Sequence, residues 1–250
     1  MSSLYPNTVN EVQKIFQRKK YIVFLVITAL IPIMAAFTFN LFQSKLGIFA
    51  VNSASFPILM LWLFTGFLWP LFIFSVASDI FSGELGEKTL KIALTRPISR
   101  FYVFLSKNIS IGIFILINLC VVFIVSVAAG LFLEGTSNMV TGLWQNMLAY
   151  ITAVFPMLFL SIEAVFLAQF FRSSGGALAT CIFVYLAAKI VPFLSSTLAK
   201  INPFAYIDWY MMWLGSSVSA GRILNVFLIL LSYSVILFAS GFYMFDKRDL

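Results

Sequence analysis

Six long apolar stretches dominate this sequence and leave little room for any other kind of fold. A helix needs roughly 20 apolar residues to cross a ~30 Å hydrocarbon core. The stretches that meet this need are approximately 21–42, 56–77, 108–133, 147–171, 176–194 and 223–245. Only 10% of the 250 residues are charged, whereas soluble domains average about 25%. We therefore expect one all-α integral membrane domain over residues 1–250, with six transmembrane helices and no separate soluble domain.

Lys and Arg are distributed unevenly among the connections, and cytoplasmic loops of membrane proteins hold an excess of both. With the N-terminus inside, the cytoplasmic side holds Lys14, Arg18, Lys19, Lys20, Lys88, Lys91, Arg96, Arg100, Lys107, Arg172, Lys247 and Arg248. The outer side holds Lys45, Lys189, Lys200 and Arg222. We expect both termini in the cytoplasm. The net charge of +7 is then a topology signal, and no nucleic-acid partner is expected.

Residues 8–20, ahead of the first apolar stretch, predict a short amphipathic helix. Thr8 and Glu11 have the spacing of a capping box, in which each side chain satisfies a free backbone N–H at a helix start. Apolar residues follow at helical spacing: Val9, Val12, Ile15 and Phe16. Such a helix either lies in the cytoplasmic membrane interface or simply extends the first span into water.

The only concentrated group of charges lies between the second and third stretches, from Asp79 to Lys107. Its members are Asp79, Glu84, Glu87, Lys88, Lys91, Arg96, Arg100 and Lys107. We expect all of them to lie in water. Within this group, Ser82 is expected to cap an amphipathic helix over residues 82–95, with acids early and bases late to complement the helix dipole. Pro97 ends that helix, and Ser99 is expected to cap the third span.

Between the fifth and sixth stretches, residues 195–222 are too interrupted to span a membrane and too apolar for a free loop. Asn202, Pro203 and Phe204 break the helical pattern, and four aromatic residues surround Asp208. Aromatic residues concentrate at the membrane–water boundary. We expect a re-entrant or interface-lying helix on the outer face. Prolines inside the first, second and fourth spans predict kinks: Pro32, Pro70 and Pro156.

Enzymatic function is not expected. The chain has no histidine, and its two cysteines, Cys120 and Cys181, sit in different apolar stretches, where they pack as small hydrophobic residues. This excludes Ser-His-Asp triads and zinc or iron–sulfur sites built from His and Cys. Residues 83–89 faintly match the phosphate loop, but Glu87 stands where that motif has glycine. We expect no bound cofactor or metal on this chain.

The charged group resembles the signature of ABC-2 type permeases, the membrane subunits of bacterial ABC transporters. The similar residues are Asp79, Glu84, Thr89-Leu90, Arg96-Pro97-Ile98-Ser99-Arg100 and Lys107, in that order. Lys88 stands where the family pattern has glycine. The six spans and the N-terminal helix also suit the family. The resemblance implies a multi-pass protein of the bacterial cell membrane that pairs with a second permease and two separate ABC ATPase subunits, which would hold ATP and Mg²⁺.

The resemblance also implies that the helix between spans two and three docks into a cleft of the ATPase. The residues predicted for this coupling are Glu84, Glu87, Lys88, Thr89, Leu90, Arg96, Pro97 and Arg100. A rigid connection to both spans would convert ATPase closure into tilting of the bundle. The alternative is that the basic residues of this segment only fix topology and contact anionic lipid.

Two ionisable residues fall inside apolar stretches, Glu163 and Lys189, together with the polar Asn118. An ionisable group at mid-helix costs about 2.5–3.5 kcal/mol on insertion scales and faces protein or a water-filled cavity. All three are candidates for a translocation path. Glu163 and Lys189 either form a buried pair or leave Glu163 protonated, while Asn118 is expected to hydrogen bond between helices. At the outer segment, the candidate gate residues are Pro203, Phe204, Asp208 and Trp209.

The predicted function is the permease subunit of an ATP-driven exporter, with an amphipathic or lipophilic cargo such as a peptide, an antibiotic or a lipid-like molecule. Two other classes remain open. An ion-coupled secondary transporter would use Glu163 as its proton carrier and would work without an ATPase. A non-transporting membrane scaffold or immunity protein would show no ATP-dependent flux.

Overall fold

Six helical runs cross the molecule in the computed structural model, which describes residues 4–46, 52–86, 99–133, 139–214 and 218–248. The runs long and apolar enough to cross a membrane are Lys19–Gln43, Phe56–Gly86, Arg100–Gly130, Gly142–Ala168, Ser174–Leu194 and Ala220–Asp246. These confirm the six expected spans, although the third begins at Arg100 and so includes Lys107. No β-strand occurs within the described ranges.

The helices follow one another with short connections. In chain order they are α1 Leu4–Gln17, α2 Lys19–Leu46, α3 Phe56–Leu63, α4 Trp69–Ser78, α5 Glu84–Gly86, α7 Arg100–Gly130, α8 Met139–Ala168, α9 Ser174–Leu194, α10 Ser196–Ile201, α11 Met211–Leu214 and α12 Ala220–Asp246. The second span also contains two π-helical turns, η1 Phe64–Leu68 and η2 Asp79–Gly83. A 3₁₀ turn, η4 Pro203–Tyr206, lies in the predicted outer segment.

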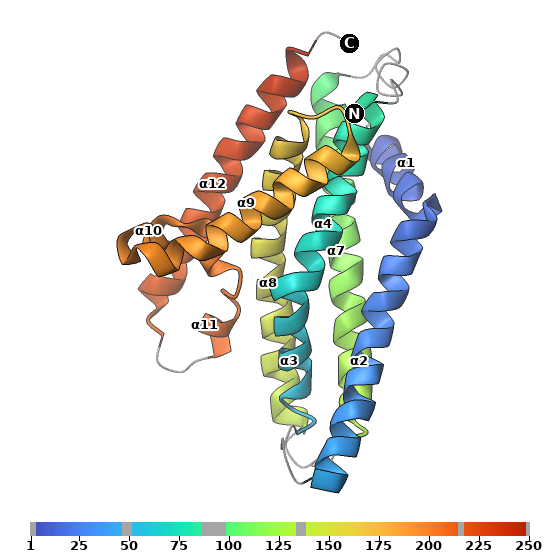
Figure 1. Cartoon of the computed structure of the whole chain (residues 1–250), viewed down its shortest axis with the longest axis vertical. Helices are drawn as coiled ribbons and strands as arrows, with labels where there is room; N and C mark the ends of the chain where they lie inside the picture. Colours follow the sequence, from blue (N-terminus) through green and yellow to red (C-terminus); the bar gives the residue numbers. More distant parts are fainter. Residues whose placement is uncertain (1–3, 47–51, 87–98, 134–138, 215–217, 249–250) are drawn as a thin grey trace.

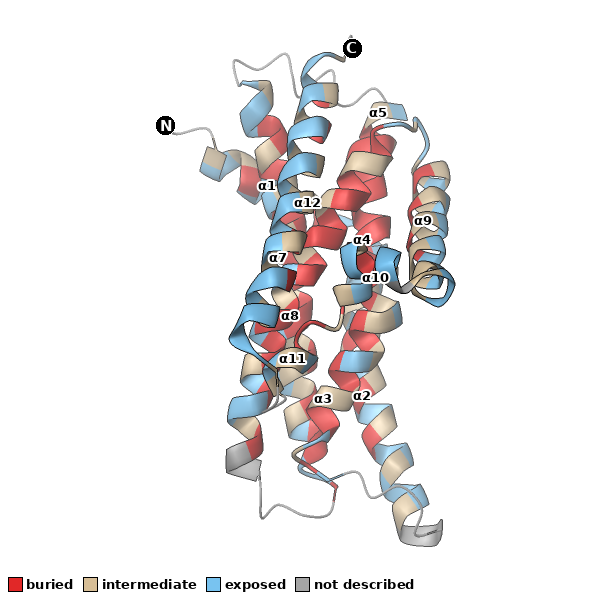
Figure 2. Ribbon diagram, turned by 90° about the vertical axis from the view of Figure 1, so that its left-hand side faces the viewer, coloured by how far each residue is buried: buried red, intermediate tan, exposed pale blue. Residues whose placement is uncertain are grey.

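The bundle has a central layer with helices of lower burial around it. Figure 1 shows α2, α4, α7 and α8 along the long axis, whereas α9 leaves obliquely. α1 and the end of α12 lie at the same end of the molecule (Figure 1). Burial is greatest on the second span and α8, and α9 and α12 expose most of their residues (Figure 2).

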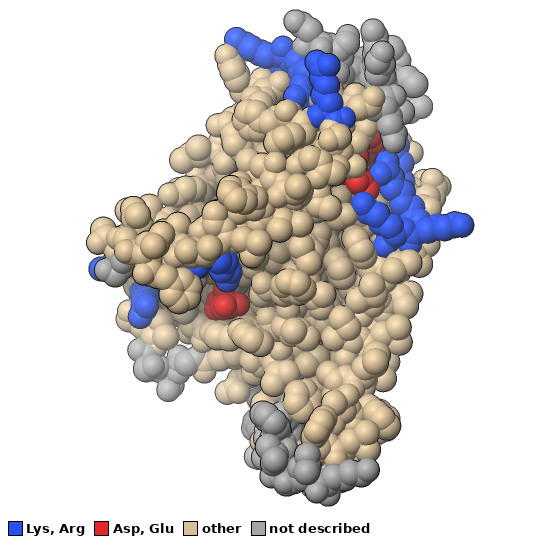
Figure 3. All heavy atoms as spheres, in the orientation of Figure 1, with Lys and Arg blue, Asp and Glu red and all other residues tan. Residues whose placement is uncertain are grey.

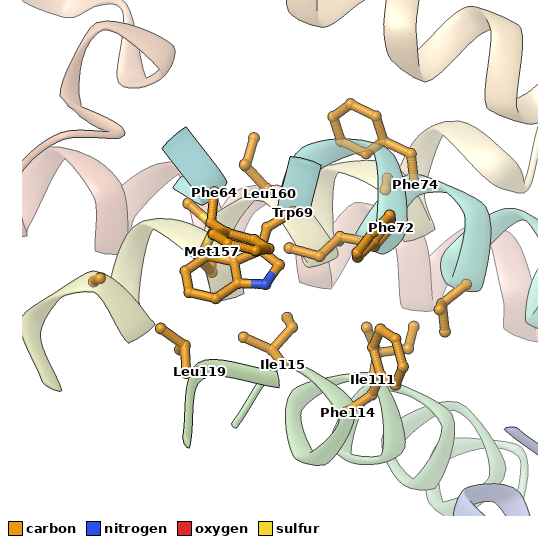
Figure 4. Close-up of a cluster of buried hydrophobic side chains, with 14 of the residues drawn as sticks. Phe64, Trp69, Phe72, Phe74, Ile111, Phe114, Ile115, Leu119, Met157 and Leu160 are labelled. Atoms are coloured by element: carbon orange, nitrogen blue, oxygen red, sulfur yellow. The ribbon is translucent and has the colours of Figure 1, made fainter. Parts of the chain in front are cut away.

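Large apolar side chains fill the space where the second span, α7 and α8 meet. Figure 4 shows Phe64, Trp69 and Phe72 of the second span facing residues of α7 that include Phe114, with Met157 of α8 on the third side. Phe72 also stacks on Phe24 of α2, with ring centroids 4.2 Å apart. Aromatic pairs of this kind add to the free energy gained by burying their area. The second span is therefore packed between α2, α7 and α8.

The N-terminal helix differs from the expected one in its start. α1 begins at Leu4, so Thr8 lies inside the helix, and its hydroxyl donates to the Leu4 carbonyl at 3.0 Å. The predicted capping box of Thr8 and Glu11 is therefore wrong. α1 ends at Gln17, and a bend at Arg18 separates it from α2, so α1 is not a straight extension of the first span. α1 packs on α7, where Phe16 meets Phe114.

Pro70 is accommodated by the π-helical turn η1. Proline has no N–H to donate to the carbonyl four residues earlier, which here belongs to Gly66. The turn lengthens the local bonding pattern, since the Trp69 N–H donates to Phe64. The hydroxyl of Tyr185 on α9 donates to the Gly66 carbonyl at 2.8 Å. The second span and α9 are therefore joined where Pro70 interrupts the helix.

The outer segment is likewise joined to α9 by a side chain that bonds to a helix carbonyl left free by a proline. Pro192 lies inside α9 and cannot donate to the Ala188 carbonyl. The side-chain amide of Asn202 donates to that carbonyl at 2.7 Å, and its oxygen accepts the Phe204 N–H at 3.1 Å. Asn202 thereby begins η4, which packs against α9, and α10 lies at the end of α9, whereas α11 lies against α8 (Figure 1).

A double-mutant cycle tests the bond between Tyr185 and Gly66. Tyr185→Phe removes the donor and should lower the free energy of unfolding in mixed detergent micelles by about 0.5–1.5 kcal/mol. In a Pro70→Ala background the new N–H can serve the Gly66 carbonyl, so the same change should cost much less. Tyr5→Phe, at a tyrosine that is 79% exposed, is the control. Equal losses in both backgrounds would contradict the assignment.

Candidate coupling site at the charged end

Most charged side chains gather at one end of the bundle, where α1, α5, the first turns of α7 and the end of α12 lie. We call this the charged end. Figure 3 shows Lys and Arg concentrated there on the face in view, with carboxylates among them. Three carboxylates at this end, those of Glu11, Asp79 and Glu84, form two groups of ion pairs, and both groups join the N-terminal segment to the second span.

Lys107 is at the centre of the first group. Its ammonium, on α7, is fully buried and lies 2.9 Å from Glu11 of α1 and 2.6 Å from Glu84 of α5. Lys14 lies on the outer side of the same two carboxylates, 2.7 Å from Glu11 and 3.4 Å from Glu84. We call these four residues the Lys107 cluster. Two ammonium groups facing two carboxylates leave no net charge buried, which is the condition for such a group to be tolerated.

The protonation equilibria on α1 reflect these contacts. Burial alone would raise the pKa of Glu11, but the ammonium groups of Lys107 and Lys14 outweigh it and hold the pKa below its ordinary value. Burial likewise would lower the pKa of Lys14, and the neighbouring carboxylates of Glu11 and Glu84 raise it instead. Both groups of α1 are therefore charged at neutral pH, as the ion pairs require.

Asp79 is at the centre of the second group. This residue begins η2, and one of its oxygens lies 2.7 Å from the Lys20 ammonium and 3.2 Å from the Arg18 guanidinium. The same oxygen accepts a hydrogen bond of 2.6 Å from the hydroxyl of Tyr21. All three partners lie at or just after the bend between α1 and α2. The Asp79 group therefore fixes that bend against the second span.

These contacts correct the expectation that every charge between Asp79 and Lys107 lies in water. Asp79, Glu84 and Lys107 are 8%, 6% and 0% exposed. α1 supplies the opposite charges for Glu84 and Lys107, and the bend after α1 and the first turn of α2 supply those for Asp79. The sequence contained a signal for this arrangement, since Glu11 lies four residues before the buried Ile15 and so on the same face of α1. A carboxylate on the apolar face of a helix requires a cationic partner.

The two predicted serine caps have different outcomes. Ser99 begins α7 as expected, and its hydroxyl accepts from the Tyr102 N–H at 3.4 Å. Ser82 does not cap a helix, because the helical run of the second span continues through it to Gly86. Instead the Ser82 hydroxyl donates to the Ala168 carbonyl of α8 at 2.5 Å. The prediction of a new helix beginning at Ser82 is therefore wrong.

Only part of the predicted coupling segment falls within the described residues. Glu84 is turned into the bundle, in the Lys107 cluster. Arg100 donates from its guanidinium to the backbone carbonyls of Asp246 and Arg248, which ties the start of α7 to the C-terminal end of α12. The other predicted members lie outside the described residues: Glu87, Lys88, Thr89, Leu90, Arg96 and Pro97.

The polar residues inside the spans do not form one site. Both oxygens of Glu163, on α8, lack a hydrogen-bond partner among the described residues, so the structure shows no pair with Lys189. The Lys189 ammonium instead lies over the Tyr185 ring, 5.8 Å from its centroid. Asn118 accepts a hydrogen bond of 3.1 Å from Thr28 of α2, which confirms the expected contact between helices.

The candidate gate residues pack as part of the bundle. Phe204 contacts the rings of Phe159 and Tyr185, and Trp209 contacts Phe155 and Phe227. Asp208 is half-buried and accepts a long hydrogen bond of 3.5 Å from Thr65. Burial raises the pKa of Asp208, and the opposing charge of Lys189 offsets this only in part. Lys189 is therefore near enough to Asp208 for its charge to act on that carboxyl, a proximity that sequence reasoning did not consider.

The fold and the sequence together define a class of protein. Residues 8–250 match the family described as ABC-2 family transporter protein, and the chain belongs to that family. It is a multi-pass bacterial membrane protein, and the family consists of transmembrane components of ABC transporters. Members of the family are typically non-catalytic and normally work with an ABC ATPase.

The chain also resembles a bacterial protein of known sequence. The chain is 28% identical over 195 residues to the "Uncharacterized protein YhcI" of Bacillus subtilis (strain 168). The matched region covers 70% of this chain and 62% of that protein, so the chain spans less than two thirds of the relative's length.

Removing the central charge tests the Lys107 cluster. Lys107→Met leaves two buried carboxylates without their shared cation and should lower the free energy of unfolding by about 3–5 kcal/mol. Lys19→Met, at an exposed lysine of the same end, should change it by less than about 0.5 kcal/mol. Denaturation in mixed micelles measures both.

A triple variant separates ion pairing from packing. Glu11→Gln and Glu84→Gln, added to Lys107→Met, remove every uncompensated carboxylate and should restore most of the lost stability. If the triple variant were less stable than Lys107→Met alone, the loss would come from packing around residue 107 and the account of the cluster would be wrong.

Proposed function

We propose that this chain is the permease subunit of an ATP-driven exporter and that a separate ATPase moves it by docking on the segment that follows Glu84. The cargo is amphipathic or lipophilic. Two permease chains, identical or related, work with two ATPase subunits, and both termini of each permease lie in the cytoplasm.

The observation that carries this proposal is the position of Glu84. It belongs to the residues that resemble the family's signature, and it lies at the last described turn of the second span, before the rest of the predicted docking segment. Its carboxylate lies between Lys107 of α7 and Lys14 of α1. If an ATPase displaced the residues after Glu84, the ion pairs of Glu84 would transmit that displacement from α5 to α1 and α7. If these charges served only to set the membrane topology, they could remain in water and would not need to be buried.

An apolar groove supports the choice of cargo. It lies between α2 and α7 in the half of the bundle away from the charged end and has a volume of about 630 Å³. Its lining is apolar apart from Asn40, whose amide donates to the Phe132 carbonyl at 2.9 Å. Sites for drug-sized molecules have volumes of about 300–1,000 Å³ and mostly apolar walls. The groove suits a flexible apolar chain better than a hydrated ion.

Copurification tests the docking role. The tagged chain, coexpressed with an ATPase encoded beside it, should retain that ATPase through purification. Glu87→Lys should reduce the retained ATPase at least tenfold, because it reverses a charge within the docking segment. Arg222→Glu, an exposed charge reversal at the start of α12, should leave retention unchanged. Loss of the ATPase in the Arg222 variant but not in the Glu87 variant would overturn the proposal.

The buried carboxyl of Glu163 favours one rival function, proton-coupled transport without an ATPase. That function requires Glu163 to release and rebind a proton in each cycle, so Glu163→Gln would abolish it. In the ATP-driven mechanism no step needs a proton from Glu163, so Glu163→Gln, which keeps the shape of the side chain, should leave ATP-dependent activity within about twofold. Transport by the native chain in vesicles without ATPase, abolished by Glu163→Gln, would establish the rival.

A further inference from the structure

The end of the second span also contacts the turn between α8 and α9. Ser82 bonds to the Ala168 carbonyl at the end of α8. A Cβ built on Gly83 would lie 3.9 Å from the Cβ of Ser174, the first residue of α9. A Cβ built on Gly86 would lie only 2.3 Å from the carbonyl oxygen of Arg172. Figure 2 shows α5 beside this turn at the charged end.

Gly86 permits an approach that no other residue allows. Carbon and oxygen atoms that are not bonded do not come within 3.0 Å of each other in this way, and here the opposing atom is backbone, which cannot rotate aside. By contrast, a Cβ on Gly175, in the first turn of α9, would meet nothing within 4 Å. A side chain at position 86 is therefore excluded by backbone, whereas position 175 of the same end has room for one.

We propose that these contacts form a joint through which movement of the docking segment passes to α9. The joint consists of Ser82, Gly83 and Gly86 on one side and Ala168, Arg172 and Ser174 on the other. Its two sides move as one body. The inference rests on the proposed function, because it assumes that an ATPase displaces the residues after Gly86.

Because α9 begins at the joint, movement of the joint would change the tilt of α9. α9 begins directly after the turn, runs obliquely away from the charged end (Figure 1), and has few buried residues to resist displacement. Tyr185 on α9 bonds to the second span, and the Ala188 carbonyl receives Asn202 of the outer segment. A tilt of α9 at the joint would therefore be delivered to the outer segment.

A disulfide across the joint tests whether its two sides move together. The distance between the Cβ positions of residues 83 and 174 is within the range for a disulfide. Gly83→Cys with Ser174→Cys, in a chain without Cys120 and Cys181, should crosslink on oxidation. ATP turnover by the complex with the ATPase should then stay within about twofold of the reduced form. A tenfold loss on oxidation, reversed by dithiothreitol, would overturn the proposal.

A glycine substitution tests transmission to α9. A bimane label on Phe193→Cys, an exposed site at the outer end of α9, should change its fluorescence when ATP is added to the native complex. Gly86→Ala should abolish that change, and Gly175→Ala should preserve it. The same response in both variants would contradict a role for Gly86. If Gly86→Ala does not fold, the disulfide experiment decides alone.

Failure of this inference is distinguishable from failure of the proposed function. If no ATPase copurifies with the native chain, the proposed function fails. If the ATPase copurifies and the label on α9 responds, but the crosslink arrests turnover or Gly86→Ala behaves as the control does, only the joint is wrong.

Discussion

The buried ammonium of Lys107 is the interaction on which the arrangement of the charged end depends. An ion removed from water costs several kcal/mol unless its partners are well placed. Lys107 has two carboxylates within 3 Å, one from α1 and one from α5. If either helix moved away from α7, the buried ammonium would lose one of its two carboxylates. The ion pairs therefore make α1, the end of the second span and the start of α7 a single unit.

Away from the charged end, α9 and the predicted outer segment are held by a different kind of contact. Pro70 and Pro192 each leave a helix carbonyl without its usual donor, and side chains of other elements, Tyr185 and Asn202, supply the missing bonds. Such bonds form only where the proline interrupts the helix, so they define where α9 meets the second span and where the outer segment meets α9. The prolines thus fix connections between helices in addition to bending them.

The features that the sequence predicted well are those that depend on local composition. The six spans follow from apolar runs, and the cap at Ser99 follows from its own neighbours. The buried ion pairs could not be predicted from neighbouring residues in the sequence, because Glu11 and Lys107 are separated by 96 positions. The resemblance placed Lys107 in the family signature but did not predict that its ammonium is buried between two carboxylates. The π-helical turn η2, which contains Ser82, likewise makes its contact with a distant part of the chain, the Ala168 carbonyl of α8.

The side of the membrane on which the charged end lies tests the account most directly, because an ATPase can reach it only from the cytoplasm. In a chain without native cysteines, Lys91→Cys places a thiol in the docking segment, and Lys200→Cys places one in the outer segment. A membrane-impermeant maleimide applied to intact cells should label position 200 and not position 91, which should react only after permeabilisation. Labelling of position 91 in intact cells would contradict the account.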